Sequence, residues 1–164
     1  MRLSHIPLRL ATGAFILNAG LAKRHLDADS AAGMQSMAAG AFPQAPSLAK
    51  MPPEQFGKTL STTEIALGAV LLTPFVSPLV AGAALTAFSA GLLQMYRSTP
   101  GLTESDGVRP TQAGTPIAKD VWMLGVGLAL VADGLIDGTK DAAKNTRKSV
   151  KKSAKKARKA LPVG

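Results

Sequence analysis

The most continuous apolar stretch of the chain lies between Glu64 and Arg97, where no residue carries a charge. Pro74 and Pro78 interrupt it near the middle, and proline breaks a helix interior because it lacks an N–H and clashes with the preceding turn. A bilayer core of about 30 Å needs only about 20 apolar helical residues to cross it. We therefore predict two membrane-spanning helices joined by a tight turn, over residues 54–74 and 79–97.

Two further apolar segments, at residues 8–24 and 116–137, complete a predicted all-α, antiparallel four-helix bundle in the membrane. The first segment also fits a signal peptide, with a basic start, an apolar centre and small residues around Ala19 and Gly20. We favour a retained helix. Four spans then place the N-terminus and the basic C-terminal segment on one side, which the positive-inside rule assigns to the cytoplasm. The expected location is the bacterial cytoplasmic (inner) membrane, with both termini cytoplasmic.

Two polar connections are expected on the outer side, at residues 25–59 and 98–115. The first is predicted to be a long loop in which the Ala/Met-rich piece AAGMQSMAAGAF lies at the interface as a short helix. Pro53 suits the first turn of the next helix, and Glu54 suits its positive N-terminal end. The second connection is rich in Gly, Pro and Thr and is predicted to be irregular.

Charge divides the chain into a body, residues 1–139, and a polybasic tail, residues 140–164. The tail holds ten of the 19 Lys and Arg residues and one acid, Asp141, and so carries the whole net charge of +9. We predict that it is disordered or partly helical and lies in the cytoplasm. Its candidate binding residues are Lys144, Arg147, Lys148, Lys151, Lys152, Lys155, Lys156, Arg158 and Lys159.

Anionic lipid head groups are the expected partner of this tail, because it is tethered beside a bilayer. Each basic residue near such a surface contributes about 1 kcal/mol. Nucleic acid would attract the same charge through counterion release, but the tail has no aromatic residue on which bases could stack. An unstructured spacer is the remaining alternative.

Composition excludes several kinds of site. The chain has no cysteine, which excludes disulfides, thiol catalysis and thiolate metal ligands within it. Its two histidines, His5 and His25, lie at opposite ends of the first predicted helix, about 30 Å apart at 1.5 Å per residue, and cannot share a metal. We find no sequence motif for a nucleotide, a metal or a catalytic triad, and expect no metal site.

Depth along the predicted helices makes Glu64 the most informative ionisable residue. It lies about 18 Å along the helix axis from Val76 in the turn, and therefore inside the hydrocarbon region. Lys23 reaches a comparable depth on the first helix, about 21 Å from Arg9. We predict an outer-half polar cluster that consists of Lys23, Glu64, Gln94, Arg97, Lys119 and Asp120. At the inner side, Arg9 and Asp133 are candidates for a second pair.

A structural interpretation of these charges competes with a functional one. Charges at helix ends, such as Arg97, Lys119 and Asp120, commonly mark the membrane interface. A buried Glu–Lys pair can fix the packing of two helices without taking part in chemistry. The sequence leaves both interpretations of Glu64 open.

The first two predicted helices share a sparse pattern of charged, glycine and aromatic positions. These positions are Arg9, Gly13, Phe15, Gly20, Lys23, Glu64 and Gly68. The pattern resembles the DoxX family of small four-helix integral membrane proteins over residues 7–137, while the basic tail lies outside the family pattern and the end of the fourth helix matches only approximately. The resemblance implies a redox-linked membrane protein, with quinone as cofactor and other subunits of a membrane oxidoreductase complex as partners. Glu64 and Lys23 would then hydrogen-bond the quinone carbonyls.

Three hypotheses of function follow. The first is a redox-associated membrane subunit, quinone-linked or involved in oxidative stress, with an intramembrane Glu/Lys polar site. The second is a non-enzymatic membrane anchor or scaffold whose basic tail binds anionic lipid or cytoplasmic partners. The third is a small transporter, and four spans without an internal repeat argue against it. The sequence identifies no substrate and leaves catalytic activity undecided.

Overall fold

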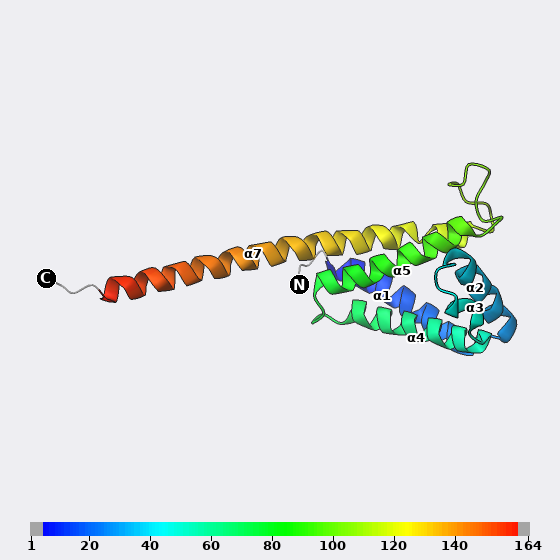
Figure 1. Ribbon diagram of the computed structural model, residues 1–164, viewed down its shortest axis with the longest axis horizontal. Coiled ribbons are helices and arrows are strands. Elements are labelled where there is room, and N and C mark those ends of the chain that lie inside the picture. Colours follow the sequence, from blue (N-terminus) through cyan, green and yellow to red (C-terminus); the bar gives the residue numbers. More distant parts are fainter. Residues whose placement is uncertain (1–4, 161–164) are drawn as a thin grey trace.

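Helices form the regular secondary structure of the described part of the chain (Figure 1). The computed structural model describes residues 5–160, except for the side chains of residues 141 and 154–160. The elements in chain order are α1 (His5–Ala22), the 3-10 helix η1 (Lys23–His25), α2 (Ala28–Ala41), α3 (Ser47–Lys50), α4 (Pro53–Leu72), α5 (Pro78–Ser98), α6 (Thr115–Ala118) and α7 (Val121–Ala160). The predicted all-α class is confirmed.

The four long helices pack as two antiparallel pairs, α1 with α4 and α5 with α7 (Figure 1). The direction of the first pair follows from its glycines, because Gly13 lies beside Leu71 whereas Gly20 lies beside Ile65. The approach is closest at Gly68, where an added Cβ atom would lie 2.7 Å from the backbone nitrogen of Leu17. Small residues allow such close approach between helices, and the backbones of α1 and α4 therefore pack almost directly on each other.

Glycines of α7 play the same part in the second pair. Gly127 lies beside Thr86, and Gly134 lies beside Leu79 nearer the turn that joins α4 to α5. The two pairs share one apolar core, to which all four long helices contribute. Its buried members are Ile16, Leu67, Leu71, Ala81, Leu85, Met123 and Leu130.

The α4–α5 hairpin closely follows its predicted limits, and each of its helices begins and ends within two residues of them. Ser77 caps α5, since its side chain accepts a hydrogen bond from the backbone N–H of Val80. Pro78 takes the first helical turn, where no intrahelical donor is required. Local sequence signals thus fix this turn.

In the connection at residues 25–59, the short helix expected in the Ala/Met-rich piece is present as α2, and the further short helix α3 was not predicted. Asp27 caps α2, and its carboxylate accepts hydrogen bonds from the N–H and hydroxyl of Ser30, which hold the pKa of Asp27 below its usual value. Gln35 of α2 is buried and donates to the carbonyl oxygens of Leu48 and Met51. These bonds fold the segment back on itself, so that α2 covers one end of the bundle against α4 and α5.

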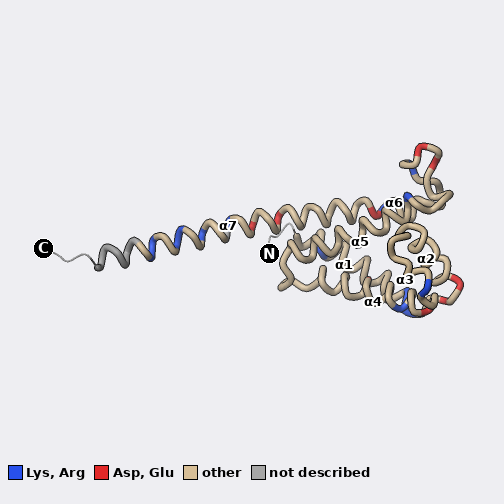
Figure 2. Tube along the Cα trace, in the orientation of Figure 1, with Lys and Arg blue, Asp and Glu red and all other residues tan. Residues whose placement is uncertain are grey.

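Helix α7 also differs from its prediction. It begins later than residue 116, after the separate short helix α6, and it continues as one helix to Ala160. Residues 140–160 of the predicted tail are therefore helical. They form a basic arm that continues α7 beyond the bundle (Figure 1; Figure 2). Lys, Arg and Ala favour helix, and no proline or glycine interrupts residues 139–160. Residues 161–164 lie outside the described part.

Two helical segments are long and apolar enough to cross a membrane, Pro78–Ser98 and Thr115–Ser153. The remaining long helices, α1 and α4, do not meet this criterion. Helix α4 carries Glu54, Lys58 and Glu64, and α1 carries Arg9 and Asn18. Length and composition alone thus identify two candidate spans rather than the four predicted.

Candidate functional site

A buried ion pair joins the first pair of helices. Lys23 Nζ lies 2.8 Å from Glu64 Oε2, and the glutamate is only 5% exposed. Lys23 follows directly on the last residue of α1, while Glu64 lies in the middle of α4. The antiparallel packing of α1 on α4 brings the two residues to the same level, as the depth along each helix predicts.

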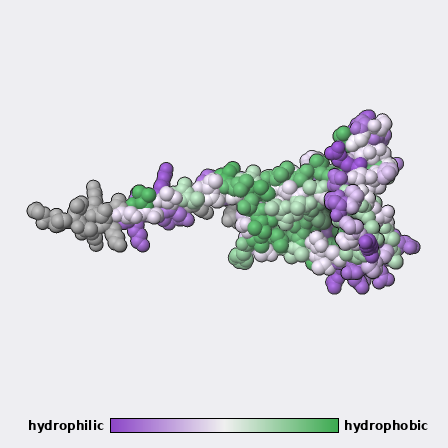
Figure 3. Space-filling view, viewed as in Figure 1, coloured by the Kyte–Doolittle hydropathy of each residue, from purple (hydrophilic) through white to green (hydrophobic). Residues whose placement is uncertain are grey.

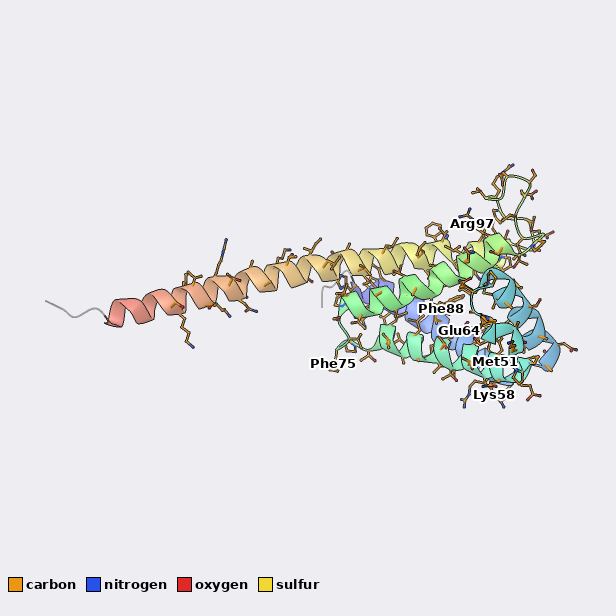
Figure 4. All side chains as sticks on the ribbon, in the orientation of Figure 1. Met51, Lys58, Glu64, Phe75, Phe88 and Arg97 are labelled. Atoms are coloured by element: carbon orange, nitrogen blue, oxygen red, sulfur yellow. The ribbon has the colours of Figure 1, made fainter. Side chains whose placement is uncertain are left out.

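The ion pair faces a cavity of about 310 Å³ between the two helix pairs. Most of the cavity wall is apolar and aromatic, with contributions from α1, α2, α4, α5, α6 and α7. Figure 4 shows Glu64 and Phe88 on facing helices in this region. The principal apolar lining side chains are Phe15, Met34, Met37, Phe56, Phe88, Leu92, Met95 and Met123. Pockets of this kind, mostly apolar with a few polar groups, are typical of small-molecule sites. The volume of this cavity lies at the lower end of the range for such sites.

Two further members of the predicted polar cluster, Lys119 and Asp120, line the same cavity. Asp120 is 7% exposed, whereas Lys119 is exposed. The ammonium of Lys119 lies 5.2 Å from the centroid of the Phe15 ring, within the range of a cation–π contact. The short helix α6 and the turn before α7 position both residues. The cavity therefore carries two carboxylates and two ammonium groups.

The other two members of the predicted cluster lie elsewhere. Gln94 is exposed and donates a hydrogen bond to the hydroxyl of Ser98 on its own helix. Arg97 is also exposed, and it lies near the end of α5, away from Glu64 (Figure 4). Both were assigned to the cluster from their depth alone, and depth along a helix does not define which face a residue occupies. Including them in the cluster was wrong.

At the opposite end of the bundle, the predicted pair of Arg9 and Asp133 is replaced by other contacts. Arg9 is 1% exposed and directs its guanidinium to backbone carbonyls at the end of α4. Asp133 of α7 lies 2.8 Å from the Nε2 atom of His5. Arg9 lies on the face of α1 that packs against α4, whereas Asp133 contacts His5 at the start of α1.

The basic arm forms a separate charged feature. The side chains of Lys144, Arg147, Lys148, Lys151 and Lys152 are exposed. Figure 2 shows their charge along the part of α7 beyond the bundle. The side chains of Lys155, Lys156, Arg158 and Lys159 lie outside the described set.

Sequence patterns missed the contribution of α2 to the cavity. Met34 and Met37 line it, although neither was among the predicted site residues. Phe56 and Phe88 line it too, and nothing in the sequence singled them out. The spacing of Met34 and Met37 places both on one face of a helix, which was the available signal.

A metal centre is not supported by the described residues, which contain no group of three or more His, Asp or Glu side chains suited to hold an ion. The cavity can instead hold a small amphiphilic molecule, since Lys23 and Lys119 donate hydrogen bonds, Glu64 and Asp120 accept them, and the aromatic and Met side chains pack an apolar body. Comparisons of the chain with family models, with curated proteins and with solved structures found no match.

Proposed function

We propose that this protein is an integral membrane four-helix bundle that binds a small amphiphilic ring compound of the quinone class between its two helix pairs. It would serve as a redox-associated membrane subunit of the DoxX type. The observation that carries the proposal is the buried Lys23–Glu64 ion pair at the wall of an aromatic cavity. Both termini would face the cytoplasm, and the bundle would lie in a bacterial cytoplasmic membrane.

The surface of the bundle supports a position in the membrane. Hydrophobic residues cover its middle, and hydrophilic residues gather at the α2 end and along the arm (Figure 3). Many of the exposed apolar residues lie on α1 and α7. They are Ile6, Leu10, Phe15, Leu21, Val121, Trp122, Leu128, Leu135 and Ile136. An apolar surface of this extent is unusual for a soluble monomer and suits a lipid environment.

The cavity fits a quinone by the chemistry of its lining. Lys23 and Lys119 can donate hydrogen bonds to carbonyl oxygens, and Phe15 and Phe88 can pack against a ring. A quinone would supply electron and proton transfer when bound. Glu64 would hold Lys23 in place, because the pair ties both side chains to the cavity wall.

Titration of the full chain in lipid nanodiscs with trimethyl-1,4-benzoquinone tests this proposal. We expect saturable binding to the wild-type protein, above that of empty discs, and at least about tenfold weaker binding to Glu64→Gln and to Lys23→Met, since a hydrogen bond to a charged group is worth about that much. Lys58→Met is the matched control, because Lys58 is exposed on the same helix as Glu64. Equal binding by all variants would refute the site, and absence of binding by the wild type would refute the ligand class.

The second hypothesis, a membrane anchor whose arm binds anionic lipid, depends on the basic arm. The arm is helical, and its described basic residues are exposed. Extended in line with α7, however, it leads away from the bilayer. Val150 lies about 21 Å past Ile136 at 1.5 Å per residue, beyond a Debye length of about 8 Å. Lipid binding by the arm therefore requires α7 to bend, and Gly138 is the weakest helical position at that point.

A further inference from the structure

Asp120 is a buried carboxylate at the cavity wall that has no hydrogen-bond partner among residues 5–160. Its residue is 7% exposed. It directly precedes α7, but it caps the helix only through its backbone carbonyl, which accepts from the N–H of Leu124 at 3.1 Å. Asp27, at the same position before α2, instead accepts the N–H of Ser30 on its carboxylate at 2.8 Å. The Asp120 carboxylate thus does not accept the backbone N–H hydrogen bond that an aspartate directly before a helix usually accepts.

Asp120 interacts with the charges of Lys119, Lys23 and Glu64 without a hydrogen bond to any of them, whereas the other charged groups of the cavity have specific contacts. Glu64 pairs with Lys23, and Lys119 lies over the ring of Phe15. Among residues 5–160, the fully enclosed side-chain atoms without a hydrogen-bond partner are His5 Nδ1, Thr86 Oγ1 and Ser89 Oγ, so the Asp120 oxygens stay accessible from the cavity, where they can accept from a donor on a bound molecule. Because the two carboxylates and two ammonium groups balance in charge, a neutral donor suits this site better than a cation.

The opening of the cavity indicates how a ligand would enter. Three of the residues that line it are exposed, namely Phe15 on α1, Pro116 on α6 and Lys119. The opening therefore lies between α1 and α6, on the side of the bundle. In a bundle embedded as proposed above, the exposed Lys119 places this opening near the membrane interface, with the exposed ring of Phe15 next to the acyl chains. Lipophilic molecules would enter directly from the membrane.

We infer that the cavity binds a neutral lipophilic phenol, whose hydroxyl group donates a hydrogen bond to Asp120 and whose ring packs between Phe15 and Phe88. The inference rests on the proposed function in that it uses the same cavity in a membrane-embedded bundle. It adds a ligand class, since a quinone has no hydroxyl group to donate. It also adds Asp120 as the residue that selects for a donor.

The test compares 4-butylphenol with 4-butylanisole, which differs only in the methylated oxygen. Binding of both is measured on the full chain in nanodiscs, with correction against empty discs of the same lipid. We expect the phenol to bind at least about tenfold more tightly than the anisole to the wild type, as a hydrogen bond to a charged acceptor implies. We expect Asp120→Asn and Asp120→Ala to reduce the preference for phenol over anisole to a value between about 1-fold and 3-fold. Asp106→Asn, in the exposed loop, should leave the preference unchanged.

Equal affinities of the wild type for phenol and anisole would overturn the inference, as would a preference that survives in Asp120→Ala. Circular dichroism of each variant separates loss of binding from loss of fold. Should both aspartate variants unfold, the test moves to the wild type, where the phenol must displace the anisole about tenfold more effectively than the reverse. A quinone that binds while phenol and anisole do not differ refutes this inference alone. Binding of the phenol without binding of the quinone refutes the quinone proposal alone.

Discussion

The Nε atom of Arg9 donates a hydrogen bond of 2.7 Å to the carbonyl oxygen of Leu71, deep between α1 and α4. The two other guanidinium nitrogens donate to the carbonyls of Val70, Thr73 and Val76 at 2.7–2.9 Å. The last carbonyls of a helix have no partners within the helix itself. Arg9 therefore closes the end of α4 and the turn after it, and this explains how a cation can be almost completely buried here.

Arg9→Met should destabilise the bundle by about 3 kcal/mol, since it removes all four hydrogen bonds at once. Arg9→Lys should recover only a small part of this loss, because an ammonium cannot reproduce the planar fork of donors. Thermal unfolding in detergent micelles, followed by circular dichroism, measures both. Arg24→Met, an exposed position on η1, is the control. A stability of Arg9→Lys equal to that of the wild type would contradict the proposed role of the fork.

The Lys23–Glu64 pair should show strong energetic coupling between α1 and α4. Lys23→Met and Glu64→Leu are each expected to destabilise the protein, because each leaves one charge without its partner. The double variant should lose about 1–3 kcal/mol less unfolding free energy than the two single variants lose together, which is the range for residues in direct contact. A double-mutant cycle on unfolding free energies measures this coupling. Additive losses would show that the pair contributes nothing to packing.

Gly68→Ala should push α1 and α4 apart. The new methyl group would lie 2.7–2.8 Å from the backbone of Leu17, which cannot move without shifting the helix. Overpacking of this kind costs about 1–3 kcal/mol. Gly125→Ala on α7 is the matched control, because nothing lies within 4 Å of its added Cβ, and it should be neutral or slightly stabilising. Equal stability of the two variants would mean that α1 and α4 are not in close contact.

The arm should change position only where anionic lipid is present. Val150→Cys provides a single labelling site, since the chain has no cysteine. In neutral nanodiscs, a fluorophore at this position should be exposed to water. With phosphatidylserine, quenching by head-group-labelled lipid should rise strongly and fall again in high salt. Lys144→Gln combined with Lys148→Gln should weaken the quenching, and unchanged quenching in both lipids would refute lipid binding by the arm.

The limits of the hairpin were predictable because its signals are local. Pro78, the serine before it and the change from polar to apolar residues each act within a few positions of the chain. The all-α class and the facing levels of Lys23 and Glu64 followed from the helical rise in the same way. The number of helices that suit a membrane span was predicted as four and is two by length and composition, because α1 and α4 carry polar residues both inside the bundle, at Arg9 and Glu64, and on its surface.

The positions of Gln94, Arg97 and Asp133 depended on contacts that no local pattern specifies. Depth along a helix gives the level of a residue, whereas the rotation of the helix against its neighbours decides whether the residue faces a cavity or the outside. The fold of α2 over the bundle likewise depends on Gln35, which bonds to carbonyls more than ten residues away.

The sequence by itself therefore determined the helical class, the hairpin and the separation of a neutral body from a basic tail. These properties depend on composition and on neighbours in the chain. Only the tertiary structure decided that the predicted polar cluster lines a cavity without Gln94 and Arg97, that Arg9 closes the end of α4 and that the tail continues as a helix from α7. Those outcomes depend on which helix faces pack together, and that choice is made by close contacts at Gly68, Gly127 and Gly134 between segments far apart in the chain.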